Sequence, residues 1–200
     1  MLKKALIIFV KNPIEGKVKT RLAKTIGNTK ALLIYKHLLA HTVLITSGIV
    51  CNKFVYYAGL VDDTDHWDNT RYEKKLQEGV DLGARMANAF KDIFHAGYHQ
   101  AIIIGSDCYQ LSTAIINDAL VQLQDTDAVL GPSEDGGYYL IGLKTMQESL
   151  FKEKSWSSEN VCSETITEFQ KTGMSYSLLP VLNDVDVEAD LDEDLRRLIK

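Results

Sequence analysis

Short apolar runs alternate along this chain with longer segments whose apolar residues recur at helical spacing. The first run, residues 5–10, is apolar throughout, which is typical of a strand buried on both faces of a sheet. Strands are also predicted at 54–58, 101–105, 128–131 and 138–143. Helices are predicted at about 29–45, at 82–94, after Ser112, after Ser157 and from about Asp190. The alternation predicts an α/β fold with a mostly parallel sheet.

Composition narrows the class of protein. The 200 residues are 46% apolar and contain no low-complexity linker, so we expect one domain over residues 1–200. A net charge of -5 argues against a nucleic-acid or membrane-surface binder. The first apolar run has six residues, too short for a membrane span or a signal peptide. Three widely separated cysteines suit a reducing cytosol, so we expect a cytoplasmic protein.

The segment that follows the first predicted strand is locally basic. Residues 11–24 hold five bases and one acid, although acids exceed bases in the whole chain. A basic, glycine-containing loop between a buried strand and a helix suits a polyphosphate, and a solvated basic turn is the alternative. The segment is not a P-loop, because Gly16-Lys17 is followed by Val18. A dinucleotide-binding G-x-G-x-x-G motif is also absent from the sequence.

Carboxylates occur where two other predicted strands end. Asp107 follows the strand at 101–105, where it could help to hold Mg²⁺ or merely begin a turn. Asp184 and Asp186 follow the last apolar run, 176–182, and could supply a second carboxylate to the same ion. The alternative is a solvated acidic face before the terminal helix, because residues 184–194 include seven acids and no base.

Two glycine-containing segments permit close approach of backbone to a ligand. Asp135-Gly136-Gly137 lies between two predicted strands, where Asp-Gly also predicts a hairpin turn. Residues 77–85 precede a predicted helix, and Gln77 offers an amide able to contact a base edge, although Asp81 also fits an ordinary helix cap. His37 and His41 are interpreted as plain helix residues, and Cys108 as a buried small residue.

Six blocks of residues, in order, resemble a largely uncharacterised bacterial family of transferases named for its association with radical-SAM and selenium genes. The blocks are Phe9-Val10-Lys11-Asn12-Pro13 with Gly16-Lys17-Val18-Lys19-Thr20-Arg21-Leu22, Gln77-x-Gly79-x-Asp81-Leu82-Gly83-x-Arg85-Met86, Gly105-Ser106-Asp107-Cys108, Gly131-Pro132-x-x-Asp135-Gly136-Gly137-Tyr138-Tyr139, Trp156-Ser157 and Asp184-Val185-Asp186. The resemblance spans nearly the whole chain. Tyr109 is a departure, because the family usually has proline there.

That family is similar to the nucleotide-diphospho-sugar transferase superfamily, which has the glycosyltransferase-A fold. The resemblance implies a three-layer α/β/α sandwich with a mostly parallel, mixed central sheet. It implies catalytic roles for Lys19, Arg21 and Asp107, and it makes Asp107 and Asp186 ligands of Mg²⁺ or Mn²⁺. It also implies a set of residues that bind the substrate or nucleotide: Lys11, Gly16, Lys17, Gln77, Gly79, Leu82, Gly83, Asp135, Gly136 and Gly137.

The expected activity is nucleotidyl transfer from an NTP to a phosphorylated small-molecule acceptor. The basic loop favours this reaction, because a triphosphate requires more positive charge than a nucleotide sugar. The alternatives are a glycosyltransferase that uses a nucleotide-diphospho-sugar and a non-catalytic nucleotide-binding protein. We expect no nucleic-acid partner and no membrane span, and a homo-oligomer is compatible with the sequence. The acceptor pocket is expected in the loops at 60–71 and 144–155, with Trp67 and Trp156 as candidate lining residues.

Overall fold

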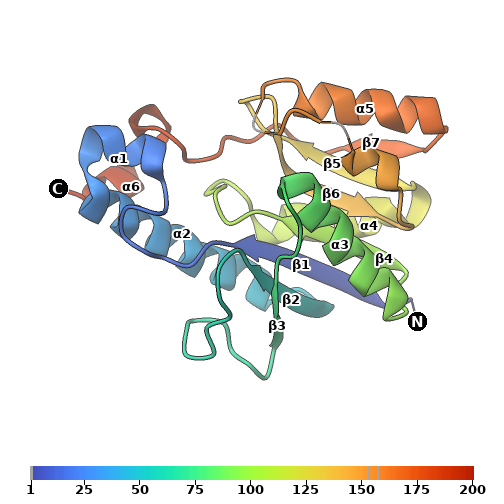
Figure 1. Cartoon of the computed structure of the whole chain (residues 1–200), viewed down its shortest axis with the longest axis horizontal. Helices are drawn as coiled ribbons and strands as arrows, with labels where there is room; N and C mark the ends of the chain where they lie inside the picture. Colours follow the sequence, from blue (N-terminus) through green and yellow to red (C-terminus); the bar gives the residue numbers. More distant parts are fainter. Residues whose placement is uncertain (1, 153, 157) are drawn as a thin grey trace.

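A seven-stranded mixed sheet forms the centre of the computed structural model, which describes residues 2–152, 154–156 and 158–200 (Figure 1). The strands are β1 (Lys4–Val10), β2 (Asn52–Tyr57), β3 (Tyr72–Leu76), β4 (Gln100–Ile104), β5 (Ala128–Pro132), β6 (Tyr138–Leu143) and β7 (Tyr176–Leu178). Their order in the sheet is β3-β2-β1-β4-β6-β5-β7. Only β6 runs antiparallel to its neighbours, so the described sheet is mostly parallel and mixed, as predicted.

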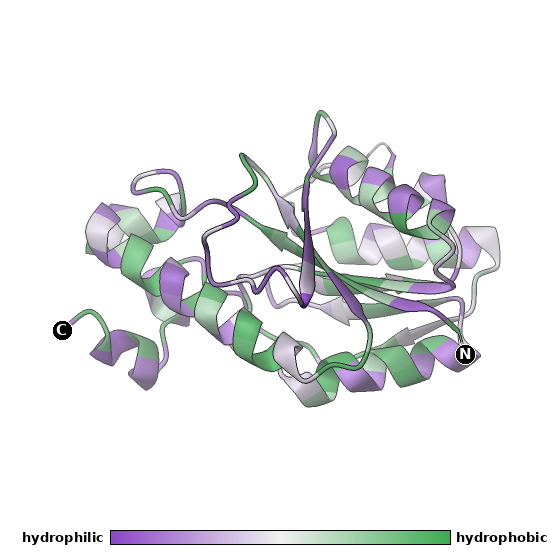
Figure 2. Cartoon of the chain, turned by 90° about the horizontal axis from the view of Figure 1, so that it is seen from below, coloured by the Kyte–Doolittle hydropathy of each residue, from purple (hydrophilic) through white to green (hydrophobic). Residues whose placement is uncertain are grey.

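Helices lie on both sides of this sheet (Figure 2), which confirms the predicted α/β architecture. They are α1 (Thr20–Ile26), α2 (Asn28–Ser47), α3 (Leu82–His95), α4 (Thr113–Asp125), α5 (Val161–Thr172) and α6 (Glu193–Arg197), with short 3₁₀ helices η1 (Glu148–Phe151) and η2 (Glu188–Asp190). Within the described ranges, no helix combines the length and the apolar character needed to cross a membrane.

The packing of strand β1 shows why residues 5–10 are all apolar. Leu6, Ile8 and Val10 pack in the core on the side of α2 and α4. The alternate residues of β1 belong to the core on the side of α3 and α5. Because successive side chains of a strand point to opposite faces, both sets must be apolar in a central strand. The sequence prediction of a strand buried on both faces is confirmed.

A third, smaller core lies beyond the end of the sheet, where α1 and α6 pack on α2 (Figure 1). Its buried members are Leu22, Ala31, Ile34, Leu38, Val185, Leu191 and Leu195. Val185 comes from the connection that links the sheet to α6. Its burial fixes the aspartates on either side of it near the end of β1, and this core therefore positions the site described below.

Two elements were not predicted, and each lacks the usual sequence signal. Helix α1 follows Lys19, which is not a favoured N-cap residue, and its segment was interpreted as a loop. Strand β3, Tyr-Glu-Lys-Lys-Leu, lies at the edge of the sheet. Its three charged residues are typical of an edge strand but break the apolar pattern by which a strand is predicted. The terminal helix also begins later than predicted, at Glu193, because Asp192 accepts a hydrogen bond from Leu195 N and caps it there.

The other predicted elements are confirmed. Strands β5 and β6 form an antiparallel hairpin around the Asp-Gly turn, and Ser112 caps α4. The helix predicted after Ser157 begins at Val161, and Ser157 itself lies outside the described residues.

Candidate functional site

The loops that follow β1 and β4 meet at the carboxyl ends of these neighbouring strands, and Tyr35 of α2 links them. The phenol oxygen of Tyr35 accepts a hydrogen bond from Lys11 N at 2.9 Å and lies 3.3 Å from Ser106 Oγ. Burial raises the pKa of Tyr35, so its phenol stays protonated. A buried and neutral side chain thus holds the first residue of the basic loop beside the residue that precedes Asp107.

Lys19 is the centre of the site. Its Nζ lies 2.9 Å from Asp107 Oδ1 and 3.1 Å from Asp186 Oδ1, and its side chain is 4% exposed. Burial lowers the pKa of Lys19, but Asp107 and Asp186 outweigh burial and raise it, so Lys19 is charged. Its backbone is left-handed, with φ of 47°. The two predicted metal ligands are therefore brought together, with a lysine ammonium between them.

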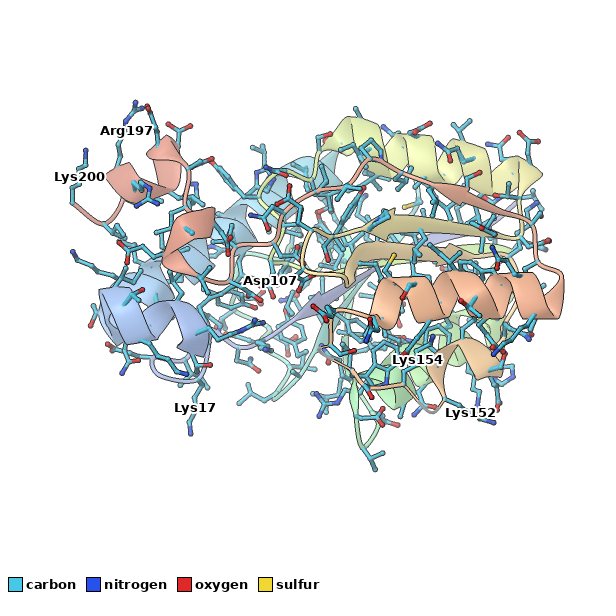
Figure 3. The ribbon with its side chains drawn as sticks, turned by 90° about the horizontal axis from the view of Figure 1, so that it is seen from above. Lys17, Asp107, Lys152, Lys154, Arg197 and Lys200 are labelled. Atoms are coloured by element: carbon cyan, nitrogen blue, oxygen red, sulfur yellow. The ribbon has the colours of Figure 1, made fainter. Side chains whose placement is uncertain are left out.

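The rest of the basic loop surrounds this ion pair. Arg21 Nη2 lies 2.5 Å from Asp186 Oδ2, although the arginine side chain is 64% exposed. With Lys11, Lys17 and Lys19, Arg21 lines a pocket of about 100 Å³ that also contains Asp107 and Asp186. We call it the basic pocket. Figure 3 shows Asp107 between the α1 and α5 ends of the molecule, with Lys17 pointing outward. Four bases and two carboxylates thus face one small space.

The segment that carries Asp186 is held on both sides. Val185 N donates to Asp107 O at 3.0 Å, which places this segment against the loop after β4. Asp190 Oδ2 accepts from Asp186 N at 2.8 Å and from Val187 N at 2.7 Å. The acids of this region therefore have separate structural contacts, and the alternative of a uniform solvated acidic face does not describe them.

The donor set fits a divalent cation that binds together with phosphate. Asp107 and Asp186 both contact one positive charge, Lys19 Nζ, so their oxygens face a common point. Among the residues that the structure describes, no three His, Cys, Asp or Glu side chains are grouped as a metal site. Mg²⁺ typically takes one or two carboxylates and completes its shell with water and phosphate oxygens. This ion would need Lys19 to move from between the carboxylates.

A second cavity, of about 290 Å³, lies beside the basic pocket and shares Arg21 with it. We call it the aromatic cavity. Apolar side chains form much of its wall: Phe9, Leu82, Met86, Ile103, Tyr138, Tyr139, Ile141, Trp156 and Val161. Its polar lining residues include Ser133, Asp135, Ser158 and Asp184. Of the described residues, none from the loops at 60–71 and 144–155 lines it, so the predicted pocket loops do not form this cavity.

The two candidate tryptophans have different environments. Trp67 is 3% exposed and packs edge-on against Tyr72 at a centroid distance of 5.1 Å, so it is a core residue. Trp156 lines the aromatic cavity. Of the two, Trp156 alone has the position expected of a ligand contact.

Asp184 lines the aromatic cavity and lies within the influence of Asp107 in the basic pocket. Burial, followed by the nearby charge of Asp107, raises the pKa of Asp184 from its ordinary value of 3.8 to about 7. The same surroundings affect Cys108, because burial and then Asp184 raise the pKa of its thiol to about 12. Cys108 is therefore an inert buried thiol, as the sequence interpretation held.

The raised pKa of Asp184 predicts a specific pH dependence of stability. Between about pH 4 and pH 7 the folded protein keeps a proton that the unfolded chain has lost, so raising the pH in this window favours unfolding. The stabilising contribution of the Asp184 proton is complete below the pKa of Asp184 in the unfolded chain. It is lost as the pH rises through the pKa of Asp184 in the folded protein, and the free energy of unfolding then falls by at most about 1.4 kcal/mol per pH unit. Asp184→Asn cannot ionise and should lack this slope.

The measurement is urea unfolding of both proteins in Mg²⁺-free buffer from pH 4.5 to pH 8. We expect the stability of the wild type to fall relative to that of Asp184→Asn as the pH rises to about 7. Parallel stability curves over this range would show that Asp184 titrates normally.

The block from Gln77 to Gly83 serves several structural purposes. Gln77 Nε2 donates to Tyr56 O at 2.8 Å and to Val10 O at 3.2 Å, so its amide N–H groups bind strand ends. A Cβ on Gly79 would lie 2.6 Å from Arg85 N. A Cβ on Gly83 would lie 2.5 Å from the Trp156 ring, so this glycine admits the tryptophan against α3. Leu82 lines the aromatic cavity, and Asp81 caps α3.

The Asp135-Gly136-Gly137 turn is built by its own side chains. Asp135 Oδ1 accepts from Ser133 Oγ at 2.6 Å and from Gly137 N at 2.9 Å. Gly136 has φ of 85° and accepts a hydrogen bond from Cys162 N, in the first turn of α5. Asp135 and Gly137 also line the aromatic cavity, so the hairpin and ligand-site interpretations are compatible. Gly16, with φ of 73°, is likewise a turn residue.

Gly136→Ala is expected to destabilise the protein by about 2–4 kcal/mol. A Cβ there would lie 2.0 Å from Glu159 O, and the left-handed backbone is itself unfavourable for alanine. Gly48→Ala is the matched control, because φ is -86° and no described atom lies within 4 Å of its Cβ position. Thermal unfolding should show a loss of several degrees for the first variant only. Equal midpoints would contradict the close contact between this turn and the segment before α5.

Tyr109, at the position where the resembling family usually has proline, packs against two histidines of α2. Its ring centroid lies 4.7 Å from that of His41 and 5.5 Å from that of His37. His41 Nε2 also lies 2.9 Å from Leu111 O. The two histidines thus support the turn after Asp107, which agrees with their interpretation as ordinary helix residues.

The sequence does not mark Tyr35 as a site residue, and of the two aspartates considered as metal ligands, 184 and 186, the resemblance implies only Asp186. Tyr35 falls within the helix predicted at about 29–45, and nothing local marks its hydroxyl as a link between two loops. Asp184 carried a signal, because it belongs to the same Asp-Val-Asp motif as Asp186. With Val185 buried between them, Asp186 contacts Lys19 and Asp184 lines the neighbouring cavity.

Comparisons with known proteins agree with this fold. The family model described as "Uncharacterized protein conserved in bacteria (DUF2064)" matches residues 43–158. A crystal structure from Desulfovibrio desulfuricans G20, described as a "putative nucleotide-diphospho-sugar transferase", is 30% identical with a TM-score of 0.85, covering 98% of this chain and 91% of that chain. No functionally curated protein matches this chain.

Two more distant structures share the fold at low sequence identity. The inositol-1-phosphate CTP transferase from T. maritima is 12% identical with a TM-score of 0.56, covering 99% of this chain and 95% of that chain. The CMP:2-keto-3-deoxy-manno-octonic acid synthetase complexed with CTP is 9% identical with a TM-score of 0.60, covering 98% of each chain. These three structural neighbours are thus described as a putative nucleotide-diphospho-sugar transferase, a CTP transferase and a synthetase complexed with CTP.

Proposed function

This chain belongs to the family of uncharacterized bacterial proteins DUF2064, and from that premise we propose that it is a nucleotidyltransferase dependent on Mg²⁺ or Mn²⁺. It would join the nucleotide of an NTP to a small-molecule acceptor and release pyrophosphate. The observation that carries this proposal is the basic pocket, where four bases and two carboxylates converge at the ends of β1 and β4. Ligands of open α/β sheets bind beyond the carboxyl ends of the strands.

The charge of the basic pocket supports a triphosphate. The side chains of Lys11 and Lys17 are exposed to solvent, whereas Lys19 pairs with Asp107 and Arg21 pairs with Asp186. A bound triphosphate would offer Lys19 and Arg21 new anionic partners and would free Asp107 and Asp186 for a cation. The cation would neutralise phosphate charge and orient phosphate oxygens when bound.

The chain's own groups would act by positioning and electrostatics. Lys19 and Arg21 would stabilise negative charge that develops on the departing pyrophosphate. An acceptor oxygen would bond to the α-phosphorus while the bond to the bridging oxygen breaks, and pyrophosphate would leave with that electron pair. A proton carried by the acceptor oxygen would pass to water. No protein nucleophile is required, which agrees with the inert thiol of Cys108 beside Asp107.

The nucleoside would bind at the loop that begins with Gln77. This residue lies at the ends of β1 and β2, next to Lys11 in space, because its amide contacts Val10 O and Tyr56 O. Gly79 and Val80 are exposed there, and Val80 is 96% exposed. An exposed apolar side chain beside an exposed glycine without a Cβ offers a surface for a flat base.

A second candidate function is glycosyl transfer from a nucleotide sugar. The two carboxylates of the aromatic cavity, Asp135 and Asp184, favour it, because a sugar there would find hydrogen-bond acceptors close to the phosphates. The donor would then transfer its sugar and release a nucleoside diphosphate.

The two reactions differ in their inorganic and nucleotide products. The protein is incubated with Mg²⁺, a deproteinised bacterial metabolite extract as the acceptor source, and either one NTP or one nucleotide sugar. We expect pyrophosphate to form from an NTP only when protein and extract are both present. Release of nucleoside diphosphate from a nucleotide sugar alone would favour glycosyl transfer. Turnover of neither donor class would overturn both proposals.

A further inference from the structure

The two adjoining cavities differ in the free positive charge that they offer. The basic pocket is lined by four bases and two carboxylates, whereas Arg21 is the only base among the described residues that line the aromatic cavity. That arginine is already paired with Asp186. The aromatic cavity also contains Asp135 and Asp184. A phosphate group would therefore find the exposed Lys11 and Lys17 in the basic pocket, whereas the one base among the described residues that line the aromatic cavity is already paired.

The walls of the aromatic cavity suit a compact ring. Its volume of about 290 Å³ is at the lower end for small-molecule sites. Tyr138 and Trp156 are partly buried in the cavity wall, and each lies against a residue of α3: Tyr138 against Met86 and Trp156 against Gly83. The Tyr138 hydroxyl donates a hydrogen bond to the thioether sulfur of Met86 at 3.9 Å, and such a sulfur is a weak acceptor. A ligand hydroxyl would offer it a better partner.

The aromatic cavity is also close to the carboxylates that would hold the cation. Arg21 borders both cavities and pairs with Asp186, and Asp184, two residues earlier in the chain, lines the aromatic cavity. Val185, next to Asp184, donates its N–H to the Asp107 carbonyl. A ring seated in this cavity would therefore present its polar edge toward the phosphates.

We propose that the aromatic cavity is the acceptor site and that it takes a neutral or cationic hydroxylated ring, not a phosphorylated one. This inference rests on the proposed function and refines its acceptor, which the sequence alone suggested to be phosphorylated. The apolar walls contact the face of the ring, and Ser133, Asp135 and Asp184 accept or exchange hydrogen bonds with its hydroxyl groups. A phosphate ester in the same place would lie beside the Asp135 carboxylate, the Asp184 side chain and one already paired arginine.

Trp156 provides a reporter for this cavity. The chain has two tryptophans, so the Trp67→Phe variant keeps only Trp156 as an emitter. The control is the Trp156→Phe variant, which keeps only the buried Trp67 and should not respond to a ligand in the aromatic cavity. Emission is recorded in the presence of Mg²⁺ and an α,β-methylene NTP analogue that cannot be cleaved. The probes are matched pairs: myo-inositol with its 1-phosphate, glucose with its 1-phosphate, and glucosamine with its 1-phosphate.

We expect at least one unphosphorylated probe to change Trp156 emission with a Kd at least tenfold below that of its phosphate ester. Asp184→Asn should weaken that probe about tenfold while the Kd of the NTP analogue changes less than threefold. Tighter binding of the phosphate esters, or no Trp156 response to any pair, would overturn the inference. A saturable Trp156 response to the analogue alone would overturn it as well, by making this cavity the nucleoside site. Failure of the analogue to bind at all would instead contradict the proposed function, so the two failures are distinct.

Discussion

Asp107→Asn is expected to lower the rate of nucleotidyl transfer by about a hundredfold or more while leaving the fold intact. Asp107 accepts the Lys19 ammonium at 2.9 Å and is 40% exposed, so its charge faces the basic pocket and is not part of a core. Asparagine keeps the shape but loses the charge that would hold the cation. Loss of one preorganised electrostatic contact typically costs on the order of a hundredfold in rate.

The comparison requires a control that removes an aspartate elsewhere. Asp125→Asn alters an exposed residue at the end of α4 and should behave like the wild type. Circular dichroism and thermal unfolding establish that both variants are folded, and pyrophosphate release measures the rate. Activity of Asp107→Asn within a few-fold of the wild type would remove this residue from the metal site.

Lys19→Met is expected to change metal binding and catalysis in opposite directions. The lysine ammonium now occupies the position between Asp107 and Asp186 where a cation would bind. Removing it should raise the affinity for Mn²⁺ in the absence of nucleotide by about tenfold, which corresponds to about 1.4 kcal/mol. The rate of transfer should nevertheless fall by about a hundredfold, because the contact to the departing pyrophosphate is lost.

Electron paramagnetic resonance of free Mn²⁺ measures the first effect without any turnover. Lys24→Met is the matched control, since Lys24 is an exposed base in α1. We expect weak Mn²⁺ binding by the wild type and by Lys24→Met, and tighter binding by Lys19→Met. If Lys19→Met binds Mn²⁺ no better than the wild type, Lys19 does not compete with a cation for these carboxylates.

Much of the fold is predictable because its signals are local. The apolar run of β1 and the Asp-Gly turn between β5 and β6 each have one physical cause that acts within a few residues. The position of the basic loop after β1 follows in the same way, because ligands collect where parallel strands end. By contrast, α1 is stabilised by Leu22 in a core shared with distant residues, and its own sequence carries no favourable cap.

The internal geometry of the site is less predictable. Lys19 and Asp186 are 167 positions apart, and the sequence suggested a phosphate partner for one and a metal for the other. The packing of Val185 into the α1–α2–α6 core, with the hydrogen bond from Val185 N to Asp107 O, brings them together. The same packing directs Asp184 toward a cavity, so a motif interpreted as one unit supplies two neighbouring sites. Burial likewise separates Trp67 from Trp156, which no local pattern distinguishes.

The central claim is that nucleotide and divalent cation bind together at the basic pocket. A thermal-shift panel of the four NTPs and several nucleotide sugars, each with Mg²⁺ and with chelator, tests it most directly. A ligand at a hundred times its Kd stabilises by about 2.7 kcal/mol, which raises the midpoint by several degrees in a chain of this size. We predict stabilisation by at least one NTP that requires Mg²⁺ and is lost in Asp107→Asn. Stabilisation that is equal with chelator, or no stabilisation of a folded protein by any NTP, would contradict the account.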